Sequence, residues 1–579
     1  MATQTTTQEG AAIVVGPRTP VLWSKTLGTL IREQAAKHGD KDAIVVPWQS
    51  TRMSYRQVED RSKLVATSLI SMGLQHGDAI GVMAGNRVEY VEVFMGAGRI
   101  GCPAVVLNNT YSAEELRQAL ARANCKMLFI ATRIGTRSLR GHIAKALGAC
   151  WPQTDLRHVV CFGDAPNVAE VSIQTYASFL QGLPRPIIEE ARLESIEASV
   201  LNSDILNLQF TSGTTGMPKA ACLTHHNIIN NARFVGSAMK LTSDDVVCCP
   251  PPLFHCFGLV MGLLASFCYG SSIMFPSDNF SAESTIQAVV QHKATALLGV
   301  PTMFISELAV VKEKGYELTT IRTGLAAGAM VPSKLMKDIR EQMNIEGMLI
   351  AYGMTETSPV TFITSIDDSQ EKRFTTIGRV FPHTSAKVVN SRGDALPFGQ
   401  RGEICTSGFA LQKGYWKDEE RTKQVMRPDE NGVIWMHTGD EGFIGSDGYG
   451  RITGRIKDLI IRGGENISPS EIEDRLLEHT SIGESCVVGL EDHKYGEVVA
   501  CFLSQARGAS ERPSDANVRS WVSQKLGRVK EPHYIFWVGD PGTGNEIPKT
   551  GSGKYQKHLV RRLGNRLVKA RRSCSNPKL

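Results

Sequence analysis

The sequence predicts an α/β protein that folds as more than one domain, and two observations lead to this prediction. Its 579 residues are 42% hydrophobic and 21% charged, a globular composition, but the chain is too long for a single core. Short apolar runs also alternate with stretches of helical spacing along most of the chain. Strands that alternate with helices form parallel β-α-β units with right-handed crossovers.

The alternation begins close to the N-terminus. Residues 27–38 have helical spacing, and 43–46 are an apolar run typical of a buried strand. Ser54 precedes a second helical stretch and is placed to cap it. Residues 87–99 are expected to be helical as well. Further strands are expected at 78–83, 103–107, 127–131, 158–162 and 272–275.

Composition excludes several classes of protein. The thirteen cysteines contain no Cys-x-x-Cys pair, which argues against a zinc site or a disulfide framework and favours a reducing compartment. A basic stretch at 554–572 carries much of the net charge of +6. It is read as a solvated helix face or as an attractor of an anionic cosubstrate. Nucleic acid is not an expected partner, because no aromatic residues are interleaved there.

The longest apolar stretch and the two termini bear on location. Residues 259–275 are too short and too interrupted to span a bilayer, so they are expected to form buried helix and strand, and no transmembrane segment is expected. Residues 1–20 are expected to be disordered, and they resemble neither a secretory signal nor a presequence. Pro577-Lys578-Leu579 keeps the Lys-Leu end of the peroxisomal Ser-Lys-Leu signal. The peroxisomal import receptor is therefore an expected partner, and the alternative location is the cytoplasm.

One loop is difficult to explain without a ligand. It follows the apolar run 205–210 and consists of Thr211, Ser212, Gly213, Thr214, Thr215, Gly216, Met217, Pro218 and Lys219. Glycines let backbone N–H groups approach an anion, and the hydroxyls and the lysine add contacts for a polyphosphate. The Gly-Lys-Ser/Thr ending of a Walker loop is absent. The alternative is an ordinary solvated Ser/Thr/Gly connection.

Three other segments carry candidate functional side chains. In Tyr352-Gly353-Met-Thr355-Glu356, the tyrosine ring can stack on a base and the glutamate can bind Mg²⁺. Glu356 could instead be an ordinary acid in the first turn of a helix. Prolines and Gly258 are expected to hold His255 at a turn, where its side chain could face a pocket. The alternative is a structural histidine packed among apolar residues. Lys554 ends a glycine-rich loop. It is either a catalytic residue or an ordinary solvated lysine.

At these motifs the sequence resembles the adenylate-forming superfamily of acyl-CoA synthetases, peptide-synthetase adenylation domains and beetle luciferases. The resemblance runs from about residue 27 to 557. Residues 352–361 and 462–466 are most similar to medium-chain acyl-CoA synthetases and to carboxylic-acid ligases of fungal secondary-metabolite and toxin pathways. It implies a large N-terminal adenylate-forming domain of stacked sheets and helices over 1–456. A smaller mobile α+β domain would follow over 457–579, with its hinge at about 456–458.

The resemblance also implies ATP, Mg²⁺, CoA and a carboxylic acid as ligands, with Glu356 as the metal ligand. Lys554, His255, Thr355 and Glu356 would be catalytic, Lys457 would be the hinge residue, and Gly463 and Gly464 would line the pantetheine tunnel. Besides the glycine-rich loop, the implied nucleotide contacts are Ala327, Gly328, Ala329, Tyr352, Gly353, Asp440 and Arg455. For Asp440 the role is to bind the ribose hydroxyls, and the alternative is a turn-forming residue.

The implied reaction has two steps. A carboxylate attacks ATP to give acyl-AMP and pyrophosphate, and the C-terminal domain then pivots so that the CoA thiol releases a thioester and AMP. Three alternatives stay open from the sequence: an adenylation enzyme that loads a carrier protein, a luciferase-like oxygenase, and a binding protein without activity.

Overall fold

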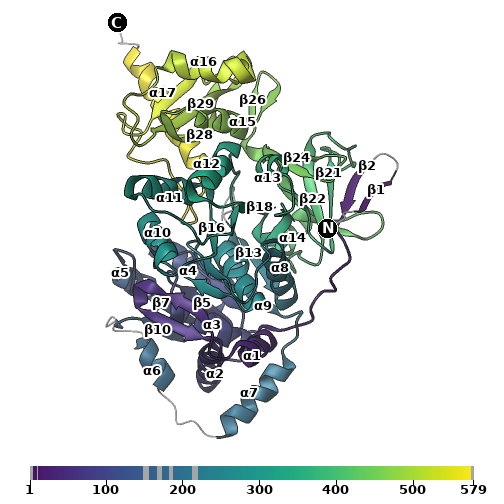
Figure 1. Cartoon of the computed structure of the whole chain (residues 1–579), viewed down its shortest axis with the longest axis vertical. Helices are drawn as coiled ribbons and strands as arrows, with labels where there is room; N and C mark the ends of the chain where they lie inside the picture. Colours follow the sequence, from purple (N-terminus) through teal and green to yellow (C-terminus); the bar gives the residue numbers. More distant parts are fainter. Residues whose placement is uncertain are drawn as a thin grey trace.

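The computed structural model describes residues 4–8, 11–147, 155–165, 173–181, 187–211 and 219–575. It confirms the predicted α/β class, with a large N-terminal part and a smaller C-terminal part stacked along the long axis of the molecule (Figure 1). Residues 212–218, which carry the centre of the glycine-rich loop, and the tripeptide 577–579 lie outside the described residues. None of the helices in the described ranges combines the length and apolar composition needed to cross a membrane.

The first sheet contains seven strands in the order β11-β10-β7-β5-β6-β12-β13, parallel except for the antiparallel pair at its β13 edge. Its strands are β5 (Ala79–Met83), β6 (Ala104–Val106), β7 (Cys125–Ala131), β10 (His158–Phe162), β11 (Ile173–Thr175), β12 (Ile205–Thr211) and β13 (Lys219–Thr224). Helices α1 (Leu27–His38), α2 (Tyr55–Ser71), α3 (Val88–Arg99) and α4 (Ala113–Ala123) belong to this part. Ser54 caps α2 as predicted, through a capping box with Gln57.

The second sheet has nine strands in the order β20-β19-β18-β17-β16-β14-β15-β3-β4. Its strands are β3 (Asp42–Val46), β4 (Thr51–Ser54), β14 (Val246–Cys248), β15 (Ser272–Met274), β16 (Ala296–Gly299), β17 (Thr323–Ala327), β18 (Gly347–Gly353), β19 (Val360–Ile363) and β20 (Arg379–Val380). Its helices include α8 (His225–Ala238), α10 (Ala282–Gln291), α11 (Pro301–Lys314) and α12 (Ser333–Met343). The apolar stretch 259–275 is buried, as predicted, in a π-helix (Phe257–Leu264), α9 (Ala265–Tyr269) and β15.

A third sheet is antiparallel and lies beside these two (Figure 1). It consists of β1 (Gln4–Gln8), β2 (Ala11–Val15), β21 (Thr384–Val389), β22 (Gly402–Gly408), β23 (Met426–Pro428), β24 (Ile434–Ile444) and β25 (Gly450–Arg455). The expectation of disorder up to residue 20 is wrong here. β2 pairs with β21, and Val14 is fully buried in the core of this sheet, so apolar burial orders a segment whose neighbours are polar.

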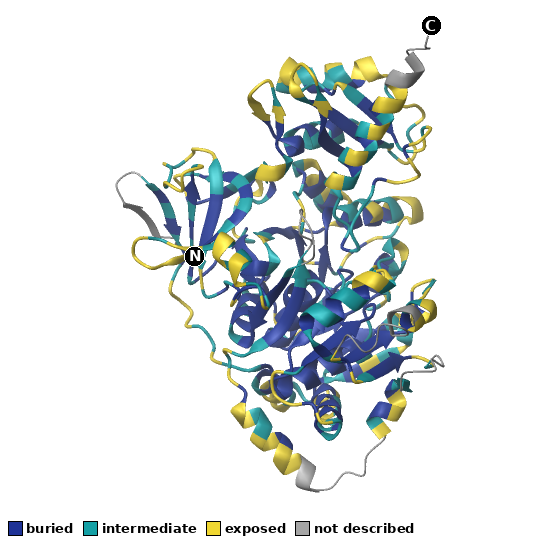
Figure 2. Ribbon diagram, turned by 180° about the vertical axis from the view of Figure 1, so that it is seen from behind, coloured by how far each residue is buried: buried dark blue, intermediate teal, exposed yellow. Residues whose placement is uncertain are grey.

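The C-terminal part has a sheet of its own, with buried strands that Figure 2 shows in dark blue under exposed helices. It contains β26 (Ile460–Arg462), β27 (Glu465–Ile467), β28 (Ile482–Asp492), β29 (Gly496–Gln505), β30 (Tyr534–Trp537), α15 (Pro469–Leu477), α16 (Asp515–Leu526) and α17 (Lys557–Ser575). A short 3-10 turn, Ile456–Asp458, joins it to β25. The hydroxyl groups of Ser468 and Ser470 donate to the carbonyl of Thr453 and tie the two parts together beside this turn.

Candidate active site

The loop that carries Lys554 leaves the C-terminal part and enters the N-terminal part. Thr550 holds the loop closed, because its N–H donates to the Lys554 carbonyl at 2.7 Å and its hydroxyl accepts from the Lys554 N–H at 3.1 Å. Thr302, at the start of α11, donates to the Gly553 carbonyl at 3.4 Å. Gly553 has φ +83°, a conformation that favours glycine, and a Cβ there would lie 3.0 Å from the Thr302 hydroxyl oxygen, a tight contact.

The side chain of Lys554 lies against Gly328, directly after β17. A Cβ built on Gly328 would be 3.6 Å from Cε of the lysine. Burial lowers the pKa of Lys554, and the charge of Arg455 lowers it further, whereas Asp440 and Glu356 oppose this. The ammonium group therefore lies among both signs of charge, in a place where an added anion would stabilise it.

Asp440 is held by two donors at the end of the third sheet. Its Oδ2 accepts from the Tyr352 hydroxyl at 2.7 Å, and its Oδ1 forms an ion pair of 2.8 Å with Nε of Arg455. Asp440 and Arg455 are register partners in the β24–β25 pair. Burial raises the pKa of Asp440, and Arg455 opposes that rise. Each carboxylate oxygen keeps a further lone pair, so the group is an oriented acceptor for hydroxyls.

Glu356 is buried in the 3-10 turn Thr355–Thr357 that follows β18. The Tyr415 hydroxyl donates to its Oε1 at 2.8 Å, and no donor among the described residues contacts its Oε2. Nζ of Lys219, the first residue of β13, lies 5.0 Å from the centre of the same tyrosine ring. Tyr415 thus connects the exit of the glycine-rich loop to the carboxylate predicted to bind the metal.

His255 is neutral in this environment. Its Nδ1 accepts from the backbone N–H of Phe257 at 3.2 Å, which leaves the ring proton on Nε2. Burial, followed by the charge of Lys554, lowers the pKa of His255 to about 3. The imidazole can therefore donate one hydrogen bond from Nε2, but it carries no charge at neutral pH.

The other predicted residues divide into those near this group and those away from it. Thr211 and Lys219 are register partners, so the two ends of the glycine-rich loop meet at the edge of the first sheet. Thr355 contacts the thiol of Cys256, which in turn donates to Gln209 Oε1 at 2.8 Å. Ala327 and Gly353 end strands β17 and β18, and Ala329 follows Gly328 directly.

Three predicted residues lie at or shortly after the turn Ile456–Asp458, where the sequence predicts a hinge. The charge of Lys457 lowers the pKa of Lys219, although burial and Arg421 have larger effects. Gly463 and Gly464 form the exposed turn between β26 and β27. No contact within the described part of the chain joins these two glycines to Lys554.

Comparison with known proteins places this arrangement in a family. Residues 31–416 match the AMP-binding enzyme family, and residues 471–554 match the AMP-binding enzyme C-terminal domain. The chain belongs to the AMP-binding enzymes. This match covers the β12–β13 loop, Tyr352, Glu356 and Tyr415 in the first segment, and Lys554 is the last residue of the second.

Among the relatives of this AMP-binding enzyme are acyl-CoA ligases that align with it over nearly their whole length. It is 46% identical to the acyl-CoA ligase sidI of Aspergillus fumigatus, over 97% of this chain and 94% of the relative. It is 41% identical to the acyl-CoA ligase cnsG of Penicillium expansum, over 96% of this chain and 97% of that one. Identity to the mitochondrial medium-chain acyl-CoA ligase ACSF2 of Rattus norvegicus is 31%, over 95% and 89% of the two chains.

Solved structures confirm the fold. The anthranilate CoA ligase AuaEII in complex with anthranoyl-AMP superposes with a TM-score of 0.82 at 23% identity, over 95% of this chain and 99% of that one. ATP-bound MatB from Rhodopseudomonas palustris gives a TM-score of 0.75 at 25% identity, over 94% and 100% of the two chains. The predicted adenylate-forming fold and the predicted membership of this superfamily are therefore confirmed.

Sequence reasoning missed residues that this AMP-binding enzyme uses to assemble the site. Tyr415 reaches Glu356 because an isolated β-bridge pairs it with Ala221 in β13. Asn108 and Thr110 follow β6 and pack against Gly551 in the Lys554 loop. The tyrosine stands in a Gly-Tyr-Trp run that could have drawn attention, but neither contact has a local sequence signal.

Proposed function

We propose that this protein is an AMP-forming acyl-CoA synthetase that activates a medium-chain or related apolar carboxylic acid. The position of Lys554 is the observation that carries the proposal. A lysine from the C-terminal part lies beside Gly328, Asp440 and Glu356 of the N-terminal part, where the α-phosphate and ribose of ATP would have to bind. The curated relatives named acyl-CoA ligases support CoA as the acceptor and an acyl group as the cargo.

The first step joins the acid to AMP. A carboxylate oxygen attacks the α-phosphorus of ATP, and the bond to the β-phosphate oxygen breaks to release pyrophosphate. Lys554 and the Thr355 hydroxyl stabilise the charge that develops around the α-phosphorus, and Asp440 and Tyr352 fix the ribose and the base. Removing a preorganised contact of this kind costs on the order of 3 kcal/mol of transition-state stabilisation.

Magnesium fits the residues present. Mg²⁺ requires hard oxygen ligands, and Oε2 of Glu356 is such an oxygen, held in place because Oε1 accepts from Tyr415. A Mg²⁺ ion held by Glu356 would supply positive charge to offset the negative charge of the leaving pyrophosphate. The glycine-rich loop 211–219 supplies the remaining phosphate contacts.

The second step transfers the acyl group to sulfur. The C-terminal domain, residues 457–579, turns about Lys457 and withdraws Lys554, and the turn at Gly463 and Gly464 then faces the adenylate. The CoA thiol, as it loses its proton, attacks the acyl carbonyl carbon, and AMP leaves. One site thereby serves two transition states that need different side chains.

A panel of carboxylic acids scored for pyrophosphate release, with and without CoA, tests the proposal. Pyrophosphate release with a medium-chain acid and formation of its CoA thioester are expected. Adenylate formation without any CoA thioester would overturn the choice of acceptor and favour a carrier protein, and oxygen consumption or light would favour an oxygenase.

Lys554→Ala tests the role of the lysine separately. The variant is expected to lose pyrophosphate release but to convert supplied acyl-AMP and CoA to thioester. Equal loss of both half-reactions would contradict this role for Lys554.

A further inference from the structure

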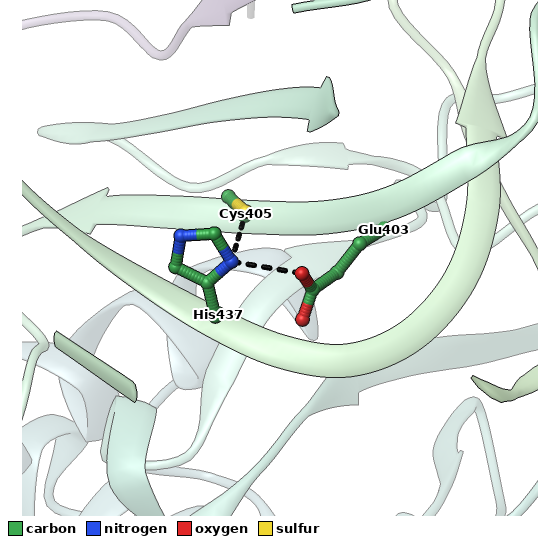
Figure 3. A group of neighbouring side chains, drawn as sticks. All are labelled: Glu403, Cys405 and His437. Atoms are coloured by element: carbon green, nitrogen blue, oxygen red, sulfur yellow. Dashed lines mark hydrogen bonds and ion pairs between the residues drawn. The ribbon is translucent and has the colours of Figure 1, made fainter. Parts of the chain in front are cut away.

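Three side chains with metal-binding atoms meet on the outer face of the third sheet. Nδ1 of His437 lies 2.8 Å from Oε2 of Glu403 and 3.5 Å from Sγ of Cys405, and all three ligand atoms lie within 4.8 Å of one another (Figure 3). Cys405 is buried, whereas Glu403 and His437 are partly exposed. A metal ion could therefore reach the group from solvent.

The sheet fixes this group without help from loops. Glu403 and Cys405 are two residues apart on β22, on either side of a register irregularity with β24, and side-chain atoms of both lie close to Nδ1 of His437. His437 is the register partner of Cys405 on β24. Cys405 and His437 are thus a cross-strand pair, and Glu403 lies on the same strand as Cys405. Pairing of β22 with β24 holds the three side chains near one another.

We propose that Glu403, Cys405 and His437 form a binding site for a transition-metal ion of the Zn²⁺ class. Thiolate, imidazole and carboxylate are the three ligand types of zinc, and three protein ligands leave a fourth position for water. Tetrahedral coordination with bonds of about 2.0–2.3 Å places ligand atoms about 3.3–3.6 Å apart. The distance of 3.5 Å between Sγ of Cys405 and Nδ1 of His437 already agrees. Oε2 of Glu403 lies closer to Nδ1, at 2.8 Å, so a bound ion requires a small rotation of the carboxylate away from the imidazole.

Two cations, Lys387 and Arg427, lie near the Cys405 thiol, and their charges favour the thiolate form that binds a metal ion. Binding displaces the thiol proton of Cys405 to solvent, and the resulting thiolate and carboxylate neutralise the ion. Lys387, the register partner of Cys405 on β21, already lies 4.2 Å over the ring of Trp435. Burial, followed by the charge of Glu403, raises the pKa of the Cys405 thiol in the metal-free protein.

The proposed site lies close to the nucleotide-binding turn but uses different atoms. Oε1 of Glu403 accepts from the Gly439 N–H at 2.9 Å, one residue before Asp440. A metal bound through Oε2 leaves that bond in place. The site is also distinct in ligand type from Glu356, because thiolate and imidazole select zinc-like ions and not Mg²⁺. The sequence analysis missed this site because it looked for Cys-x-x-Cys pairs, whereas these ligands come from two different strands.

Cobalt titration of the full-length protein after chelator treatment tests the proposal. We expect one Co²⁺ per chain, with a thiolate-to-cobalt charge-transfer band and tetrahedral d–d bands that Zn²⁺ abolishes and excess Mg²⁺ does not. Cys405→Ser is expected to lose the charge-transfer band and His437→Gln to weaken Co²⁺ binding at least tenfold. Cys501→Ser, a buried cysteine of β29, is the matched control and should keep the full signal.

Two results would overturn the proposal: no charge-transfer band in the unmodified protein, or a band that survives in Cys405→Ser. If that variant does not fold, zinc X-ray absorption on the unmodified protein decides. One sulfur with nitrogen and oxygen neighbours supports the site, and a shell without sulfur contradicts it. These readouts do not depend on ligase activity, so they stand apart from the proposed function.

Discussion

Arg455 and Asp440 face each other across β24 and β25, and their ion pair of 2.8 Å is the only salt bridge of Asp440 among the described residues. The arginine is half-exposed and the aspartate is buried, so the ion pair stabilises the charged form of a buried carboxylate. Desolvation alone would favour the protonated acid, which cannot accept two ribose hydroxyls equally well.

Arg455→Met is therefore expected to raise the KM for ATP about tenfold or more at pH 7, a loss of about 1.4 kcal/mol. Without the guanidinium, the pKa of Asp440 rises further above its usual value, so the defect should shrink as pH increases and the carboxylate ionises. ATP titrations of initial rate between pH 6 and 9 measure this. Arg451→Met, on the same strand but bonded to the Thr375 carbonyl, is the control and should leave the KM unchanged.

Tyr415→Phe removes the hydroxyl that donates to Oε1 of Glu356 and nothing else. Outer-shell contacts of this kind typically change metal affinity by about 10–100-fold. We expect the Mg²⁺ concentration for half-maximal pyrophosphate release to rise about tenfold. Tyr449→Phe also deletes a hydroxyl bonded to a carboxylate, at 2.6 Å from Asp368, and should not change the Mg²⁺ dependence. An unchanged dependence in Tyr415→Phe would separate Glu356 from the metal.

Gly551→Ala should displace the Lys554 loop without altering the lysine. The added Cβ would meet Thr110 Cγ2 at 2.8 Å and Asn108 Oδ1 at 2.9 Å. A shift of about 1 Å in a catalytic group can cost about 100-fold, so pyrophosphate release is expected to fall about 10–100-fold. Thioester formation from supplied acyl-AMP should persist, because Lys554 leaves the site in the proposed second step.

The control for this substitution is Gly141→Ala, in α5 (Arg140–Leu147), where a Cβ meets nothing within 4 Å. It should leave both half-reactions unchanged. Loss of both half-reactions in Gly551→Ala, measured in parallel, would show general unfolding of the C-terminal part and not a displaced loop.

Local patterns predicted the elements that depend on local forces. Residues 27–38 are the observed helix α1, and Ser54 caps α2 through a box with Gln57, because helix periodicity and capping are properties of adjacent residues. The π-helix at 257–264 was expected only as buried helix, since its wider hydrogen-bond spacing depends on packing. β2 was missed because its partner, β21, lies about 370 residues away in the chain.

The candidate site follows the same division. Motifs predicted Lys554, Glu356 and Asp440, which the structure brings near one another, since those side chains stand in recognisable runs. Tyr415 and Thr110 escaped notice because they contact other residues across the fold. Ser468 and Ser470, at the start of α15, likewise act at a distance, because both donate to the Thr453 carbonyl across the junction of the two parts.

Glu307 on α11 is a buried acid that no sequence pattern distinguishes from a solvated one. It has no accessible surface, and neither carboxylate oxygen has a hydrogen-bond partner in the described structure. Burial raises its pKa to about 8. Because the folded pKa exceeds the unfolded value of about 4.3, the native state binds more protons between these limits. Titration of Glu307 therefore leaves the free energy of unfolding unchanged below about pH 4.3. That free energy falls by up to about 1.4 kcal/mol per pH unit as the pH rises toward 8.

Glu307→Gln keeps the shape but removes the titration, so its melting temperature should fall less steeply than that of the unmodified protein between pH 5 and 8. An amide without a partner costs about the same at every pH, so the slope is diagnostic and not the absolute value. Melting curves at pH 5, 6.5 and 8 measure it. Glu317→Gln changes the same charge at an exposed position, and its slope should match the unmodified protein. Parallel slopes for Glu307→Gln and the unmodified protein would mean that Glu307 ionises normally and finds water in the folded state.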